Sequence, residues 1–249
     1  MTAAPMDRAL RAAFDATWPA PDFETVGGFR VTRAPDGGGR LNSARVIDAW
    51  TADDIERVAA LQRGRGDGPR FMVEDGDAAL ARALDGRGMV GRDATAILEA
   101  PATRLMELPI PPVTALTIWP PLAIQTDLWA ENGIGPARRA AMDRAPGPKT
   151  ALLGRIRDRA AGVGFVAVHG PVAMVHALVV PPEFRRQGVA AWLMRRAGHF
   201  ATGHGAPRVA LAVTRANAGA LALYDRLGFV EVGGYRYFTD APAVAETAT

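Results

Sequence analysis

The sequence predicts an α/β fold of the α+β kind, in which a mixed central sheet is flanked by helices and a similar unit occurs twice in tandem. Three observations support this. The C-terminal half of the 249 residues reads as three strands, a helix, a strand, a helix and a final strand. A segment at 70–88 resembles 210–228 at an offset of 140 residues. A glycine-containing turn at 181–188 joins an apolar strand to an amphipathic helix.

The C-terminal elements follow from apolar periodicity and turn residues. The apolar run 172–180 is typical of a strand buried on both faces. Val189, Leu193 and Phe200 recur at helical spacing, and Gly228 ends the next helix. Strands are expected at 149–156, 162–169, 172–180, 208–214, 229–232 and 235–238, and helices at 189–200 and 217–227.

The N-terminal half is interpreted as a degenerate copy of the same unit. With Gly88 set against Gly228, Asp77 falls on Asn217 and Leu84 on Tyr224. The loop 63–68 is glycine-rich, but it follows a helix and precedes a strand, the reverse of the order that a phosphate site needs. Strands are expected at 28–34, 43–49, 70–73 and 95–100, and helices at 7–17, 52–62 and 77–84.

Prolines divide the two halves. Pro109, Pro111 and Pro112 favour an extended path, which is typical of a linker. We therefore expect an N-terminal domain at 1–105, a linker at 106–113 and a C-terminal domain at 114–249, with the C-terminal unit as the functional one.

Composition excludes several classes of protein. The absence of cysteine rules out disulfides and thiolate catalysis, and the four histidines are scattered, so no metal site is expected. The net charge is only +3 with no dense basic block, so nucleic-acid binding is not supported. No apolar run is long enough to span a membrane, and the start of the chain has no signal-peptide pattern. We expect no membrane partner and a cytoplasmic location.

The turn between strand and helix predicts an anion site. A small-residue turn ahead of a helix leaves backbone N–H groups unpaired at the positive end of the helix dipole, which is suited to a pyrophosphate. The pattern is Arg-x-x-Gly-x-Ala, with a second arginine adding charge. The candidate cofactor-binding residues of this turn are Arg185, Arg186, Gln187, Gly188, Val189 and Ala190.

A second motif stands downstream. Asn217, Ala220, Tyr224, Gly228 and Phe229 form the pattern N-x-x-A-x-x-x-Y-x-x-x-G-F. Together, in this order and at this spacing, the two motifs resemble the Gcn5-related N-acetyltransferase (GNAT) family over about residues 149 to 238.

The resemblance implies acetyl-CoA as co-substrate, with no metal, and assigns roles to particular residues. The strand ending at Val180 splays from its neighbour, and the backbone of Leu178 and Val180 bonds the cofactor. Asn217 contacts the cofactor arm, although its position also suits a helix N-cap. Tyr224 places its hydroxyl near the sulfur as the general acid, although a core tyrosine that only packs its ring is the other interpretation.

The sequence offers one candidate base and a candidate acceptor region. Many relatives carry a carboxylate where this chain has Met174. His176 lies two residues on, faces the same side of the strand and has a suitable ordinary pKa, so it is the candidate base; a satisfied core histidine, a water relay and capture of neutral amine stay open. The family's first strand and substrate loop correspond to a region containing Trp119, Trp129, Glu131 and Asn132.

These observations predict an N-acetyltransferase that moves acetyl from acetyl-CoA to an amine of a small molecule or amino acid. Attack would be direct, in a ternary complex, because there is no cysteine to carry the acyl group. The alternative is a non-catalytic acyl-CoA-binding regulatory module, which the missing strand carboxylate favours slightly.

Overall fold

One mixed sheet of eleven strands forms the centre of the protein. The computed structural model describes residues 6–241, and the strand order is β1-β2-β3-β4-β11-β5-β10-β9-β8-β7-β6. The strands are β1 Asp22–Val26, β2 Phe29–Arg33, β3 Ala44–Val46, β4 Arg70–Glu74, β5 Met89–Pro101, β6 Ala115–Ile118, β7 Lys149–Ile156, β8 Arg159–His169, β9 Val172–Val179, β10 Arg208–Thr214 and β11 Val230–Asp240.

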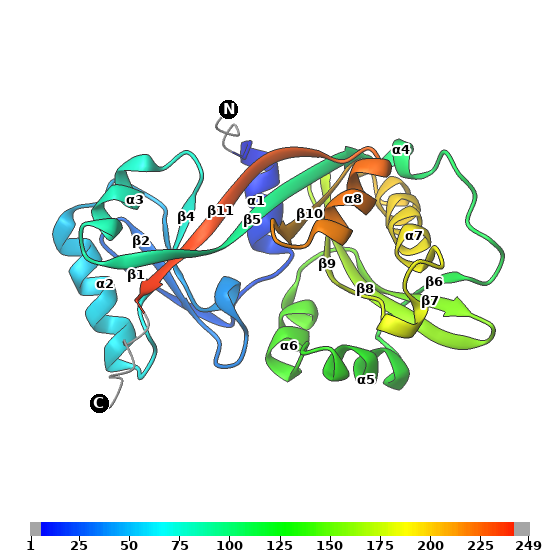
Figure 1. The fold of residues 1–249 in the computed structure, drawn as a ribbon, viewed down its shortest axis with the longest axis horizontal. Helices are drawn as coiled ribbons and strands as arrows, with labels where there is room; N and C mark the ends of the chain where they lie inside the picture. Colours follow the sequence, from blue (N-terminus) through cyan, green and yellow to red (C-terminus); the bar gives the residue numbers. More distant parts are fainter. Residues whose placement is uncertain (1–5, 242–249) are drawn as a thin grey trace, which may run out of the picture.

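Helices cover both faces of this sheet (Figure 1). They are α1 Arg8–Ala16, α2 Ala52–Gly64, α3 Ala78–Asp85, α4 Ala102–Leu105, α5 Ala123–Glu131, α6 Pro136–Arg144, α7 Val189–Gly203 and α8 Ala218–Arg226, with short 3₁₀ turns η1 Gly39–Leu41 and η2 Pro182–Phe184. In the C-terminal unit, α7 packs on the face that holds Val175, while α1 packs on the opposite face, which holds Met174. The alternation along β9 explains why that strand is apolar throughout.

The two units exchange strands. β5, from the N-terminal half, lies between β10 and β11, and β11, from the end of the chain, lies between β4 and β5. Figure 1 shows these two long strands running side by side from one unit to the other. The sheet is therefore continuous across both halves.

The last strand differs from the prediction. Residues 229–232 and 235–238 were predicted as two strands around Gly233 and Gly234, but Val230–Asp240 is one strand, so that prediction is wrong. Its register against β5 shifts between Glu231 and Gly233 and again between Tyr235 and Tyr237. Glycines in a strand are typical of such bulges as well as of turns.

The predicted tandem repeat is confirmed in local detail. Asp77 caps α3 by accepting a hydrogen bond from the Leu80 N–H at 3.0 Å, and Asn217 caps α8 by accepting one from the Ala220 N–H at 3.1 Å. Gly88 and Gly228 follow these helices with φ of 74° and 81°, a conformation that glycine adopts without steric cost. The two segments thus share a cap, a helix and a left-handed ending.

Asp7 is the N-cap of the first helix, α1. Its carboxylate accepts from the Leu10 N–H at 2.8 Å and from Arg208 Nη1 at 2.6 Å. Asp7→Ala should lower the free energy of unfolding by about 1 kcal/mol, the usual cost of losing an N-cap. Urea unfolding measures this loss, and Asp85→Ala, at an exposed carboxylate near the end of α3, is the control that should show none.

The loss should depend on pH in a defined direction. The Arg208 guanidinium, and then the Leu10 N–H, lower the pKa of Asp7 from 3.8 to about 2. A carboxylate with a lowered pKa stabilises the fold above its ordinary value, and this contribution is lost as the pH falls through about 2. The difference between wild type and Asp7→Ala should therefore shrink below pH 3.8, and a difference that grew there would contradict this role.

Candidate active site

A wedge opens in the sheet where β9 and β10 separate. The two strands pair only between Val172–Val175 and Arg208–Leu211. Beyond this point the register of β9 against β8 shifts, and Ala177 takes a positive φ of 49°. Trp129 Nε1 donates to the Ala177 carbonyl at 2.9 Å, which holds the irregular segment in place. The predicted splaying of this strand from its neighbour is thus present.

The wedge is part of a cavity of about 1360 Å³ that extends beyond the two strands. Its walls come from both units of the chain: the predicted turn before α7 and the α8 helix on one side, and a loop of the N-terminal half on the other. The predicted residues that line it are His176, Leu178, Val180, Arg185, Arg186, Gly188, Val189, Ala190, Asn217 and Tyr224. Gln187, the remaining predicted residue of the turn, does not line it.

The turn before α7 offers a set of unpaired backbone donors. Gly188 is the N-cap, with φ of 91°, and no side chain caps the helix. Among the described residues, no hydrogen bond is donated by the backbone N–H groups of 187–191. An added Cβ at Gly188 would lie 3.0 Å from the Trp192 ring, so the position requires glycine for both its backbone and its space.

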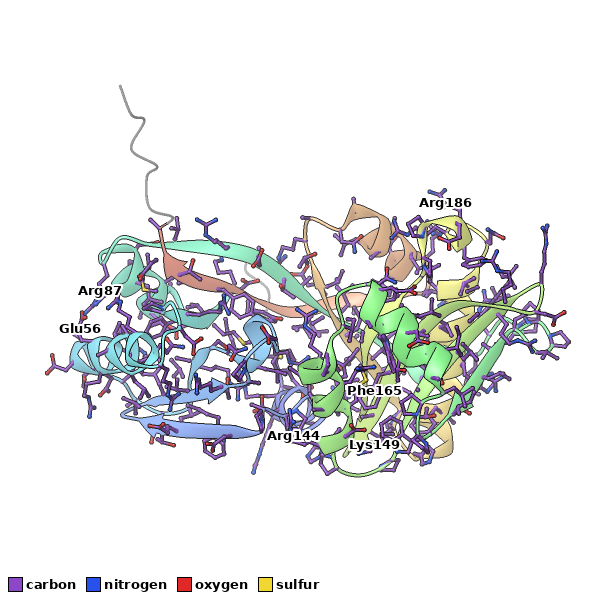
Figure 2. The ribbon with its side chains drawn as sticks, turned by 90° about the horizontal axis from the view of Figure 1, so that it is seen from below. Glu56, Arg87, Arg144, Lys149, Phe165 and Arg186 are labelled. Atoms are coloured by element: carbon purple, nitrogen blue, oxygen red, sulfur yellow. The ribbon has the colours of Figure 1, made fainter. Side chains whose placement is uncertain are left out.

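The side chains of this turn shape it and add charge. Arg185 Nε donates to the Val180 carbonyl at 3.0 Å, and the Gln187 amide donates to the Glu183 carbonyl at 2.9 Å. Arg186, with a φ of 64°, projects from the turn at the outer edge of the molecule (Figure 2). Open donors, two arginines and a helix N-terminus fit a pyrophosphate group, so the residues present fit the CoA that sequence analysis implies.

Tyr224 lies in the cavity wall on α8. Its side chain is only 6% exposed, and its ring packs edge-on against Phe229 at 5.6 Å between centroids. No hydrogen bond to its hydroxyl is present among the described residues. Burial raises the pKa of Tyr224 to about 12, so the phenol keeps its proton at neutral pH and is able to donate it or to hydrogen-bond a developing anion.

Asn217 combines the two predicted features. Its side chain caps α8. The residue also lines the cavity, about two helical turns before Tyr224 and on the same face of α8. A single asparagine thus starts the helix that carries Tyr224 and borders the cavity.

His176 is buried, with 7% exposure, and both of its ring nitrogens have partners. Arg40 Nη1 lies 3.3 Å from Nδ1, and Thr17 Oγ1 lies 2.8 Å from Nε2. Because a guanidinium only donates, Nδ1 accepts and Nε2 carries the proton. Burial, with the charge of Arg40, holds the pKa of His176 well below its usual value. The lone pair on Nδ1, which a base would need, therefore faces the Arg40 guanidinium. Through Thr17 and Arg40 the ring also links the end of α1 to η1.

The structure adds residues that sequence reasoning missed. Trp18, Gly37, Gly38, Gly39 and Arg40 come from the N-terminal half and line the cavity of the C-terminal unit. Their only local signal is the run of three glycines before Arg40, which by itself indicates a loop. Nothing local to the sequence shows that this loop reaches the other unit.

The residues predicted for the acceptor region separate into two groups. Asn132 lines the cavity, whereas Trp129 is fully buried and supports β9. Trp119 and Glu131 do not line the cavity. Met174, at the position of the family's carboxylate, is fully buried against α1.

Two negative findings concern the part of the chain from 6 to 241. No group of three or more histidine, aspartate or glutamate side chains is placed to hold a metal ion within it. None of the helices that the structure describes has the length and apolar character to cross a bilayer.

Comparisons with known proteins point to one family over part of the chain. The model of the acetyltransferase (GNAT) family matches residues 122–229, which include both motifs. Among curated proteins, none matches the sequence of this chain significantly.

Solved structures match the whole chain in fold. A GCN5-related N-acetyltransferase from Kribbella flavida is 18% identical with a TM-score of 0.72, covering 97% of this chain and 98% of that one. A tandem GNAT protein from the clavulanic acid biosynthesis pathway is 16% identical with a TM-score of 0.62, covering 97% and 91%. A conserved protein of unknown function from Staphylococcus epidermidis is 13% identical with a TM-score of 0.65, covering 91% and 95%. The segment 122–229 therefore matches the GNAT acetyltransferase family, and the fold of the whole chain is similar to that of a tandem GNAT protein.

Proposed function

We propose that the protein transfers an acetyl group from acetyl-CoA to an amine of a small molecule or amino acid, by direct attack in a ternary complex. The observation that carries this proposal is the row of unpaired backbone N–H groups at 187–191, which opens onto the wedge between β9 and β10. Tyr224 lines the same cavity as this turn.

The chain's own residues divide the work. Gly188, Val189 and Ala190 present the N–H groups that would hold the pyrophosphate, with Arg185 and Arg186 beside them. The unpaired segment of β9 around Leu178 would lie along the pantetheine arm. When bound, acetyl-CoA supplies an acetyl group activated as a thioester.

Proton handling centres on Tyr224. Its phenol holds a proton at neutral pH, next to the region where negative charge would develop, and we propose it as the catalytic acid. His176 is better suited to positioning than to taking a proton, because its acceptor nitrogen already faces Arg40. The amine would then bind as the neutral form or lose its proton to water.

A thiol-release assay over a panel of amines tests this function. Acetyl-CoA and longer acyl-CoAs are each mixed with the protein and one amine, and free thiol is followed alongside mass spectrometry of the amine. We expect amine-dependent thiol release matched by acetylated product, with acetyl-CoA preferred. Tight CoA binding without release for any amine would instead identify a regulatory acyl-CoA-binding module.

A further inference from the structure

One end of the cavity, away from the turn before α7, is built by residues of both halves. There η1 and the loop before it meet the loop before α6 and the two tyrosines of β11. An added Cβ at Gly38 would lie 2.5 Å from Arg138 Nη2, and one at Gly39 would lie 2.9 Å from the Tyr237 ring. The glycines therefore let backbone, arginine and phenol come together at one place.

Arg40 is the central cation of this end. Its guanidinium stacks over the Phe14 ring at 3.6 Å from the centroid, donates to the Phe14 carbonyl and reaches His176. No carboxylate of the described residues forms an ion pair with it. The neighbouring Asp15 is already bonded to Arg45 in a two-pronged contact.

Arg138 adds a second cation from the C-terminal unit. It lies on α6 and reaches only the Gly133 carbonyl, at 3.4 Å, among the described residues. The charge of the cavity lining is strongly one-sided, because Asp93 is the one carboxylate in its described lining. Two arginines without acidic partners, one of them held against a ring, leave guanidinium donors available for an anion.

We infer that this end of the cavity recognises a carboxylate on the acceptor, so that the substrate class is amino acids or similar amines that carry an acid group. The inference rests on the proposed function and narrows it. Arg40 and Arg138 would bind the carboxylate, with the phenols of Tyr235 and Tyr237 as further donors. Through Arg40 the N-terminal half would thus take part in substrate recognition, beside Arg138 and the two tyrosines of β11.

Paired ligands test the inference. Each proteinogenic L-amino acid is compared with its own carboxamide, which keeps the amine and the side chain but removes the negative charge. Binding is measured by thermal shift with CoA present, so that the cofactor turn is filled and no reaction occurs; kcat/KM with acetyl-CoA is measured in parallel. We expect the best acid to bind roughly 10-fold or more tightly than its amide, the scale of a hydrogen bond to a charged group.

Two variants assign the preference to the arginines. In Arg138→Gln the amino acid and its carboxamide should bind almost equally well. Arg139→Gln removes the same charge at the next position of α6, outside the cavity lining, and should retain the preference for the acid. Arg40→Lys keeps the charge but loses the planar fork, and should weaken the preference; if this variant fails to fold, Arg138→Gln decides.

The contrary outcomes are separable from failure of the proposed function. Equal binding of acids and amides, or a preference that survives in Arg138→Gln, would overturn the inference even if acetyl transfer to amines is observed. A carboxylate preference in the binding assay without any thiol release would keep the inference and reject the transfer reaction.

Discussion

Ala190→Glu should abolish acetyl-CoA binding in a protein that remains folded. Ala190 lies in the first turn of α7 and lines the cavity, so a carboxylate there would stand against the pyrophosphate. Like charges about 4 Å apart at an effective dielectric constant of about 20 repel by roughly 4 kcal/mol, which corresponds to a loss of about 1000-fold in affinity. Titration calorimetry measures the loss and should give one site per wild-type chain, since only one unit has the cofactor turn.

Ala52→Glu is the matched control for this variant. Ala52 is exposed in the first turn of α2, which is the counterpart of α7 in the N-terminal unit, so the same change should leave CoA affinity unaltered. Gly188 is the less suitable position, because its φ of 91° and the nearby Trp192 ring would strain any side chain. Unchanged CoA affinity in Ala190→Glu would show that CoA does not bind at this turn. Two CoA sites per chain would show that the N-terminal unit binds the cofactor as well.

Tyr224→Phe should lower kcat by roughly 100-fold or more, the usual scale for a positioned acid, with little change in cofactor affinity. The ring and its contact with Phe229 remain, so thermal stability should hardly move. Because burial raises the pKa of Tyr224 to about 12, the phenol stays protonated across the neutral and mildly alkaline range. Deprotonation of Tyr224 should therefore not lower the kcat of the wild-type protein at any pH below 10, the ordinary pKa of a tyrosine.

Asp225→Asn, at the exposed neighbouring position of α8, is the control and should keep kcat. Two results would change the assignment. Near-normal kcat in Tyr224→Phe would return the residue to a packing role, and a large loss of CoA affinity with normal kcat would make the hydroxyl a binding contact.

The turn and the helix proposed to hold the cofactor could be predicted because they depend on local sequence. The turn at 185–190 and the helix from Asn217 to Tyr224 are each continuous, and their chemistry follows from backbone geometry and residue type. The tandem repeat was also visible, since caps and helix-ending glycines recur at a fixed offset. Local rules determine such features, so one segment is enough to predict them.

The acceptor side was not predictable for the opposite reason. Arg40 and His176 are 136 positions apart and meet only because the two units share a sheet. His176 has a suitable residue type and strand position for a base, yet the partner that changes its role comes from the other half. The short strand β1, the helix α6 and the early start of β5 were also missed, because their apolar periodicity is weak or their residues are partly exposed.

The exchanged strands set the order in which the molecule can be completed. Residues 230–240 form the strand that fills the gap between β4 and β5, so the sheet of the first unit cannot be completed before these residues have been synthesised. Ordinary tandem proteins finish one domain while the next is being made. Here the long-range strand pairing makes the folding of both halves a single late step. That step carries the conformational-entropy cost of bringing together residues that are far apart in the sequence. Removing either half would take a paired strand out of the sheet of the other, so neither half has its full set of strand partners alone.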